Sequence, residues 1–456
     1  MVRFCDLPSE VVEKIMLLVP ADSLVECKSV NKFWYSCIST FIKDPKFVAK
    51  HLLVTKTESF MSLLCFKDPS PHEDHCLITY PLLTINHVDG DGDGDDDDDV
   101  DDDDVTIIHD GDDDDEDGGS DYDDVTIIPD DDGDNDDDDG GGGGDDDGKK
   151  DHFTIVTAYL TIPLLDMNRW DRIYHCNGLL LLVNYSYKKT ITMVLCNPVL
   201  KESMILPKPK NVTFVAHHHH YIGFEHDSRN NKYKCVSLWL GDEEECKVEV
   251  YTLGSDSWRE INMSQDVMDY IAQAEVTELC NGVCFGGVCY WCISQLGIEK
   301  ILSFDMSSEE FRMIDLPRDS LFDIEDWSDN YILCLAVWND SVVMSLTPNF
   351  TWKHDDPYHD ESILLIFTMD KGVAGGWTKY EQVGPLEKYY NNLLPFWKNN
   401  EILMEVFEDG SVEHLASCNI RTQKLRNVVF DRVRKINLRY GWVCLYEKSL
   451  ISIRRE

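Results

Sequence analysis

The sequence predicts an α+β multidomain protein. A small N-terminal domain of three helices precedes an all-β, propeller-like domain, which is interrupted by an Asp-rich insertion that we expect to be disordered. Apolar residues recur at helical spacing in the first 52 residues. Asp and Gly dominate the stretch from 89 to 150, which contains too few apolar residues to offset the entropy of ordering it. Beyond it, short apolar runs alternate with turn residues about every ten residues.

The expected domain boundaries follow from these changes in composition. Residues 1–52 form the helical domain, and residues 53–88 connect it to the start of the β-domain. Residues 89–150 are the insertion, and residues 151–456 are the all-β domain. A chain of 456 residues is long enough for two or three domains with a sizeable core.

The N-terminal helices carry more apolar surface than they can bury. Two stripes run along the first helix: Val11, Ile15 and Leu18, and beside them Val12, Met16 and Val19. Pro20 ends this helix because it has no N–H to donate. Three short helices cannot cover so much apolar surface among themselves, so we expect the remainder to bind another protein. The alternative is a helical hairpin that packs on its own chain.

The same segment carries a motif. Its residues are Leu7-Pro8, Ile15-Met16, Val19-Pro20, Ser23-Leu24, Val30, Trp34, Asp44-Pro45-Lys46-Phe47 and His51-Leu52. This pattern resembles the F-box, with conservative departures at Met16 and Val19. The resemblance implies docking onto the Skp-type adaptor of a cullin ubiquitin ligase, and through it onto the cullin and RING subunits. The adaptor-binding residues it implies are Leu7, Pro8, Ile15, Pro20, Leu24, Val30 and Trp34.

The formal net charge of −45 is mostly local. The stretch from Asp89 to Gly148 holds 33 acidic residues and no Lys or Arg, which leaves 53 acidic against 41 basic residues, or −12, elsewhere. Within it, Asp104–Asp110 returns as Asp124–Asp130, which indicates tandem expansion of a short unit. The acidic balance argues against nucleic acid as a partner and favours a basic protein.

From Phe153 onward the pattern is typical of β-structure. The main apolar runs are Leu179–Asn184, Met193–Cys196, Tyr233–Leu240, Lys247–Leu253, Val283–Ile293, Ile301–Asp305, Tyr331–Val337, Ile363–Met369, Glu401–Glu405 and Val443–Tyr446. Turn signals such as Asn197-Pro198 and Gly286-Gly287 separate them. About 300 residues at this spacing give some two dozen strands, too many for one sandwich, so we favour a propeller-like closed array.

This region carries a second resemblance. Its residues are Tyr174–Leu180, Cys196-Asn197-Pro198, Val250–Arg259, Asn281–Trp291 and Ile301–Pro317. They are similar to the plant F-box-associated domain, and the ending Tyr446–Ile453 is similar to S-locus F-box proteins in particular. The resemblance implies a non-catalytic substrate receptor of an SCF-type E3 ubiquitin ligase. In the S-locus branch, the pollen receptor binds basic style ribonucleases in self-incompatibility.

No constellation of residues indicates catalysis, a cofactor or a metal. The run His217–His220 places at most two side chains on one face of a strand. Cys289 and Cys292 form one Cys-x-x-Cys pair with no second pair at zinc-ribbon distance, so buried thiols are expected. The spacing of Asp91–Asp95 is unlike a calcium loop because Asp102 stands where an EF-hand needs Glu. Trp258 and Trp291 are expected in the core.

The compartment follows from the cysteines and the N-terminus. The chain has 16 cysteines but no apolar signal region, and no apolar run that could span a bilayer. We therefore expect free thiols and a cytoplasmic location, with the nucleus as the alternative and no membrane partner.

Two other functions are open at this point. The Asp-rich tract could make the chain an acidic histone- or cation-binding protein, or it could be a neutral expansion with no role. An enzyme built on the β-domain is disfavoured because no acid, base or nucleophile pattern is present.

Overall fold

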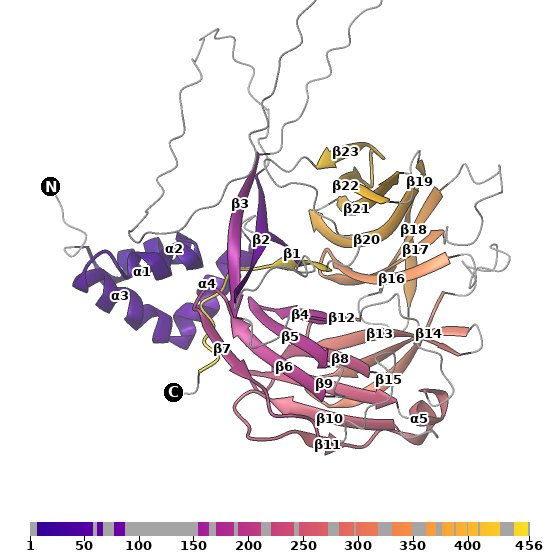
Figure 1. The fold of residues 1–456 in the computed structure, drawn as a ribbon, viewed down its shortest axis with the longest axis horizontal. Helices are drawn as coiled ribbons and strands as arrows, with labels where there is room; N and C mark the ends of the chain where they lie inside the picture. Colours follow the sequence, from indigo (N-terminus) through magenta and orange to yellow (C-terminus); the bar gives the residue numbers. More distant parts are fainter. Residues whose placement is uncertain are drawn as a thin grey trace, which may run out of the picture. The chain divides into compact units, whose positions relative to one another are not determined.

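The computed structural model describes most of the chain outside the acidic insertion (Figure 1). The described residues are 7–57, 62–66, 77–86, 154–163, 170–186, 190–210, 220–240, 246–271, 282–295, 298–317, 331–348, 362–370, 376–386, 389–398, 400–408, 411–428 and 442–454. The predicted disorder of residues 89–150, the Asp91–Asp95 spacing and the histidines 217–219 lie outside them. Within the described part, no helix is long and apolar enough to cross a membrane.

Four helices precede the first strand. They are α1 (Ser9–Leu18), α2 (Ala21–Cys27), α3 (Lys32–Lys43) and α4 (Pro45–Thr57). The sequence predicts three helices ending by residue 52, and the structure adds α4. This helix starts at Pro45, which can lack an N–H because the first N–H groups of a helix have no acceptor within it. The backbone N–H of Lys46 donates to Asp44 Oδ1 at 2.9 Å. Asn31 caps α3 in the same way, accepting from Phe33 and Trp34 at 3.0 and 3.1 Å.

The helices bury one stripe of apolar side chains among themselves. The buried members are Val12, Met16, Ala21, Leu24, Ile38 and Phe47. Of the two stripes along α1, the structure therefore turns Val12 and Met16 inward and leaves the other one outside. The ring of Phe47 packs against the ring of Phe41, with centroids 4.7 Å apart, which joins α4 to α3.

The rest of the described chain contains 24 strands in six four-stranded antiparallel sheets, with one further helix, α5 (Gln265–Ile271). Five sheets are each formed by four consecutive strands, and the first two of them are β4 (Arg172–Cys176), β5 (Leu179–Ser186), β6 (Thr190–Asn197) and β7 (Glu202–Ile205), then β8 (His220–Asp227), β9 (Lys232–Leu240), β10 (Cys246–Thr252) and β11 (Arg259–Ile261). The third sheet consists of β12 (Val283–Phe285), β13 (Val288–Gln295), β14 (Ile298–Asp305) and β15 (Glu310–Asp315), and the fourth of β16 (Tyr331–Trp338), β17 (Ser341–Pro348), β18 (Ser362–Met369) and β19 (Trp377–Leu386). The fifth sheet consists of β20 (Tyr389–Lys398), β21 (Glu401–Glu408), β22 (Ser411–Asn419) and β23 (Leu425–Val428). The sixth has the order β24 (Trp442–Tyr446), β1 (Ser62–Phe66), β2 (Leu77–Asn86) and β3 (Thr154–Pro163).

The first strand of each sheet contacts the first strand of the next, so the sheets form a closed ring. The contacts run from β4 to β8, β12, β16, β20 and β24, and from β24 back to β4. The ring closes through the sixth sheet, in which β24 pairs with β1 from Ser62↔Tyr446 to Phe66↔Trp442. This arrangement confirms the predicted all-β, propeller-like fold and its two dozen strands, and we call each sheet a blade.

The acidic insertion joins two neighbouring strands of one blade. β2 and β3 pair over their full length, from Leu77↔Pro163 to Asn86↔Thr154. The chain between Asn86 and Thr154 therefore leaves and re-enters the blade at adjacent positions. The insertion thus replaces a hairpin turn and interrupts no strand.

Turn residues separate consecutive strands within a blade at positions that the sequence predicts. The run Val283–Ile293 is a hairpin, β12 and β13, because Gly286 and Gly287 both have positive φ, at 64° and 86°. Asn177 and Gly178 form the same kind of turn between β4 and β5, with φ of 51° and 79°. Gly178 also leaves no room for a side chain, because a Cβ there would lie 2.5 Å from the carbonyl oxygen of Glu447.

Tryptophans join neighbouring blades. Trp258 and Trp291 are buried, as predicted from the sequence. The Trp258 indole N–H donates to the carbonyl of Pro207 in the preceding blade at 2.5 Å, and Trp377 donates to the carbonyl of Asp315 at 3.1 Å. Trp291 donates to the carbonyl of Ile222 across another blade interface at 3.1 Å. These rings are therefore structural.

An ion network links the blade of β8 and β9 with the next blade. Lys234 Nζ lies 2.8 Å from Asp227 Oδ2 and 3.0 Å from Glu309 Oε1. The side chains of Lys234 and Asp227 are only 7% and 0% exposed. Burial alone would raise the pKa of Asp227, but hydrogen bonds from Lys234, Asn230 and Ser307 hold it well below its usual range.

We predict that Asp227→Asn destabilises the β-domain by about 3–5 kcal/mol at pH 7, because it leaves the buried Lys234 without its nearest carboxylate. Since the pKa of Asp227 is lowered by folding, its contribution to stability is present above the unfolded value of about 4 and is lost as the pH falls below it. Urea unfolding between pH 7 and 3 should therefore show a shallower pH dependence in the variant than in the wild type.

Asp315→Asn is the matched control, because Asp315 pairs with Lys300 at 2.9 Å but is 71% exposed. Its effect should stay within about 1 kcal/mol. Equal pH dependence of the wild type and Asp227→Asn would contradict the role of the network.

Candidate functional site

Large apolar side chains are exposed mainly on the helices. Among the described residues, nine such side chains are exposed, and seven of them belong to α1, the α2–α3 turn, α3 or α4: Val11, Ile15, Leu18, Val30, Phe33, Tyr35 and Leu53. The other two, Ile205 and Tyr380, lie singly on strands of different blades. Since single exposed apolar residues are ordinary and clusters of them mark interaction sites, the helices are the candidate binding surface.

The outer stripe of α1 is the most regular part of this surface. Val11, Ile15 and Leu18 follow one another at intervals of four and three residues, which places them on one face of the helix. Leu18 is 61% exposed. Val12 and Met16 of the neighbouring stripe lie in the helical core, whereas this stripe stays exposed.

The predicted adaptor-binding residues fall into three groups. Pro8, Ile15, Pro20 and Val30 are exposed, with Val30 at 64%. Leu7 and Trp34 are half-buried at the edge of the helical core, and the Trp34 ring meets the Phe33 ring edge-on at 6.3 Å. Leu24 is 2% exposed and packs inside the core. The short helix α2 turns Leu24 inward, and its contact with the adaptor stays a prediction.

The sequence motif leaves out several exposed residues. Val11, Leu18, Phe33 and Tyr35 stand on the same helices and are exposed, but they are not among the predicted contacts. The signal for Val11 and Leu18 is present in the sequence as the stripe that also contains Ile15. Phe33 recurs at helical spacing with Cys37 and Phe41, so its signal is also present in the sequence.

The helices are fastened to the β-domain by the C-terminal segment. Leu450 from this segment and Val199 from the β6–β7 turn both enter the helical core. Lys448 pairs with Asp22 of α2. Lys56 of α4 donates to Asn177 Oδ1 at 2.8 Å, in the turn that joins β4 to β5.

Asn197 holds this segment in place. It is fully buried, and its amide N–H groups donate to the carbonyls of Ser449 at 3.0 Å and Ile451 at 2.7 Å. Its side-chain oxygen accepts from the backbone N–H groups of Val199 and Leu200 at 3.0 and 3.3 Å. One side chain thus joins the C-terminal segment to the turn that reaches the helices.

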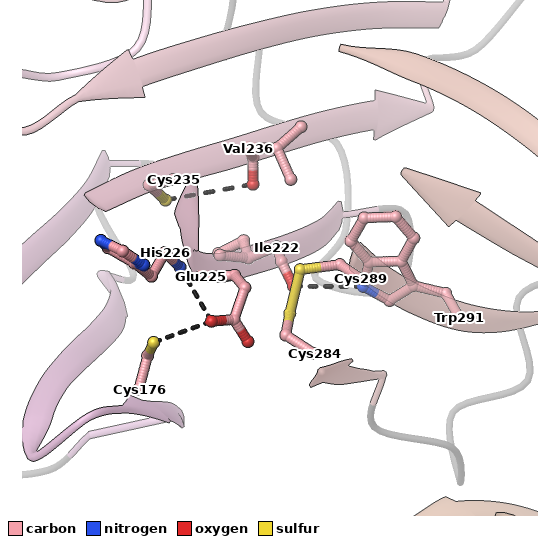
Figure 2. The surroundings of a disulfide bond; sticks show 9 residues. All are labelled: Cys176, Ile222, Glu225, His226, Cys235, Val236, Cys284, Cys289 and Trp291. Carbon is pink, nitrogen blue, oxygen red and sulfur yellow. Dashed lines mark hydrogen bonds between the residues drawn. A yellow bond between two sulfur atoms is a disulfide. The ribbon is translucent and has the colours of Figure 1, made fainter. Parts of the chain in front are cut away.

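The thiols are partly paired, contrary to the sequence prediction of free thiols. Cys284 and Cys289 form a disulfide between directly opposite residues of the β12–β13 hairpin (Figure 2). The Cys-x-x-Cys residues of the sequence, Cys289 and Cys292, point to opposite sides of β13 and pack into different clusters. Sequence spacing could not show that a two-residue turn brings Cys284 opposite Cys289.

Other polar side chains in this region are buried and hydrogen-bonded to each other. The Cys176 thiol donates to Glu225 Oε1 at 2.9 Å, as Figure 2 shows. Burial and the Glu225 carboxylate raise the pKa of Cys176 well above its usual range, so it remains a thiol and a poor nucleophile. His220 is buried between Tyr185 and Ser237, and the described residues contain no group of three metal-ligating side chains.

Comparisons with known proteins fit this geometry. The family model described as F-box associated beta propeller domain matches residues 150–453, and the F-box domain model matches residues 4–46. An Arabidopsis thaliana protein named as an F-box protein (At3g10430) is 31% identical over 176 residues, which are 37% of this chain and 45% of that one. An F-box/kelch-repeat protein (At3g22730) of the same plant is 31% identical over 31% of this chain and 36% of its own.

The chain spans less than half the length of these two relatives. Among solved structures, the β-propeller domain of the Trilobed protease from Pyrococcus furiosus is 11% identical, with 57% of this chain and 70% of that one covered. The TM-score is 0.32, which is too low to support an inference about this chain.

We predict that Asn197→Ala loosens the C-terminal segment from the helices, because it leaves four buried backbone groups without their partner. Limited proteolysis should cut the segment 447–454 and the helices at least tenfold faster than in the wild type, while the blades resist. Thr192→Ala, five residues earlier on β6, should leave the rate unchanged. Unchanged cleavage in Asn197→Ala would refute the fastening role.

Proposed function

Since the chain belongs to the F-box proteins that carry an F-box-associated β-propeller domain, we propose that it is the substrate-recognition subunit of an SCF-type (Skp–cullin–F-box) E3 ubiquitin ligase. The helices bind the Skp-type adaptor, which brings the cullin and RING subunits. The β-domain binds the protein to be ubiquitinated, and catalysis belongs to the partner subunits. Such a receptor works in the cytoplasm or the nucleus.

The observation that supports this proposal is the exposed apolar stripe on helices that are fastened to the propeller. Val11, Ile15 and Leu18 offer one face of α1 to a partner, and Val30 extends the apolar surface at the α2–α3 turn. An apolar surface of this kind, with an aromatic ring at its edge, matches the anchors of protein interfaces. In our proposal Pro8, Ile15, Pro20, Val30 and Trp34 contact the adaptor, with Leu7 at the rim and Leu24 supporting from inside.

We predict that Ile15→Asp weakens binding to a recombinant Skp-type adaptor by at least about thirtyfold, because it buries an unpaired charge in the interface. Trp34→Ala should have an effect of similar size. Titration calorimetry with the full chain measures both. Ile205→Asp is the matched control, since Ile205 is also exposed, at 57% against 38% for Ile15, but lies on β7.

The melting temperature should be the same for Ile15→Asp and Ile205→Asp, which separates lost binding from lost folding. Wild-type affinity in both Ile15→Asp and Trp34→Ala would overturn the adaptor assignment. Leu24→Ala should behave differently and lower the stability of the helices, by about 2–5 kcal/mol, because Leu24 lies in their core.

For the substrate we propose a basic protein, and a style S-ribonuclease of the self-incompatibility system as the specific candidate. The ending Tyr446–Ile453 supports this assignment through its similarity to S-locus F-box proteins. The net charge of −12 outside the Asp-rich tract also favours a basic partner. Affinity purification from native tissue would test it, with adaptor and ribonuclease recovered together.

We predict that the Asp-rich tract steers a basic substrate electrostatically. Deleting residues 89–148 should leave adaptor binding unchanged and should lower the association rate of a basic ribonuclease about tenfold at low salt, with a shallower salt dependence. Stopped-flow association measures this. Equal salt dependence in the two forms would exclude steering. Binding of histones or cations that the deletion abolishes, with no adaptor bound by either form, would instead favour the acidic histone- or cation-binding function.

A further inference from the structure

A buried arginine begins the innermost strand of the first blade. The Arg172 side chain is largely covered at the start of β4, and its Nη1 donates to the carbonyl of His220 at 3.1 Å. Its other partner is the hydroxyl of Tyr174, and the phenols of Tyr185 and Tyr221 lie within electrostatic reach. All these groups are neutral.

Arg172 has no carboxylate to balance it. Among the described residues it forms no ion pair, whereas the buried Lys234 has two. A guanidinium carries five N–H donors in a planar fork that fits a carboxylate with two bonds. Keeping a covered cation among neutral partners costs free energy unless an anion pairs with it.

The neighbouring groups include further buried N–H donors. The ring nitrogens of His220 are occupied by the Tyr185 hydroxyl at 2.9 Å and the Ser237 hydroxyl at 2.8 Å. The Trp239 ring stacks on His220, with centroids 4.5 Å apart. Trp239 is only 5% exposed, and its indole N–H finds no acceptor among the described residues. The indole N–H of Trp170, two residues before Arg172, is in the same state.

These donors lie at the end of the blades that faces away from α4. Lys56 of α4 binds Asn177, which follows the last residue of β4, whereas Arg172 is its first residue. Arg172 meets the start of β8 at His220, and Cys176 meets its far end at Glu225, so β4 and β8 run side by side in the same direction. The end that carries Arg172 is thus left clear of the helices.

We propose that Arg172, with the indole N–H of Trp239, binds the carboxylate of an acidic residue of the substrate between the first two blades. The inference rests on the proposed receptor function, because it assigns one contact of the substrate. A strongly acidic chain repels free anions at long range. An otherwise basic partner would overcome this repulsion, and Arg172 would then select an acidic residue at one position of its surface, which makes the contact a specificity determinant.

The test uses the full chain bound to its Skp-type adaptor, with sodium acetate and inorganic phosphate as probes at constant ionic strength. NMR follows the side-chain Nε–H of Arg172 and the indole N–H of Trp239, assigned through Arg172→Lys and Trp239→Phe. Acetate should shift both signals saturably in the wild type. Arg172→Lys should weaken the response of the Trp239 signal at least tenfold, because an ammonium cannot make two parallel bonds.

Arg259→Lys is the matched control, since Arg259 already pairs with Glu309 at 2.6 Å, and it should leave the acetate response unchanged. No saturable shift, an equal response in Arg172→Lys with an unchanged melting temperature, or tighter binding of phosphate than of acetate would each overturn the proposal. Adaptor binding is measured separately on the same samples, so failure of the receptor function would be seen as loss of the adaptor, whatever the anions do.

Discussion

The pairing of β24 with β1 is the constraint on which the β-domain depends. It joins residues 442–446 to residues 62–66, so the ring of blades closes only when both ends of the domain are present. Closure gives every innermost strand a neighbour on each side. Because this contact has the largest sequence separation in the domain, its loop-closure entropy must be overcome late, after local hairpins such as β12–β13 have formed. The inter-blade tryptophan bonds and the Lys234 network then reinforce a ring whose topology is already set.

The same C-terminal chain also fixes the helices. After β24, the segment passes Asp22, places Leu450 in the helical core and is held by Asn197. The element that closes the ring is therefore continuous with the element that attaches the helices. This links the integrity of the β-domain to the position of the helices, because a ring that fails to close also releases their anchor.

Much of this architecture could be predicted from the sequence, and the failures have physical reasons. Helical stripes, apolar runs and turn residues identified the helices, the strands and the buried Trp258 and Trp291, because these depend on local periodicity. Which stripe of α1 faces inward, and that Leu24 is buried, depends on packing between helices. The Cys284–Cys289 bond and the neutral surroundings of Arg172 depend on which strands become neighbours. No spacing in the sequence encodes those encounters.

The hairpin of β2 and β3 has a consequence for how this chain can change. Ten residue pairs hold the two strands together up to Asn86 and Thr154. Closing a loop at such a clamp adds only about 0.6 kcal/mol for each doubling of its length. The Asp-rich unit that recurs twenty residues apart can thus be gained or lost in steps with little effect on the blade. Variation in the length of the tract would then change the charge of the protein almost independently of its stability.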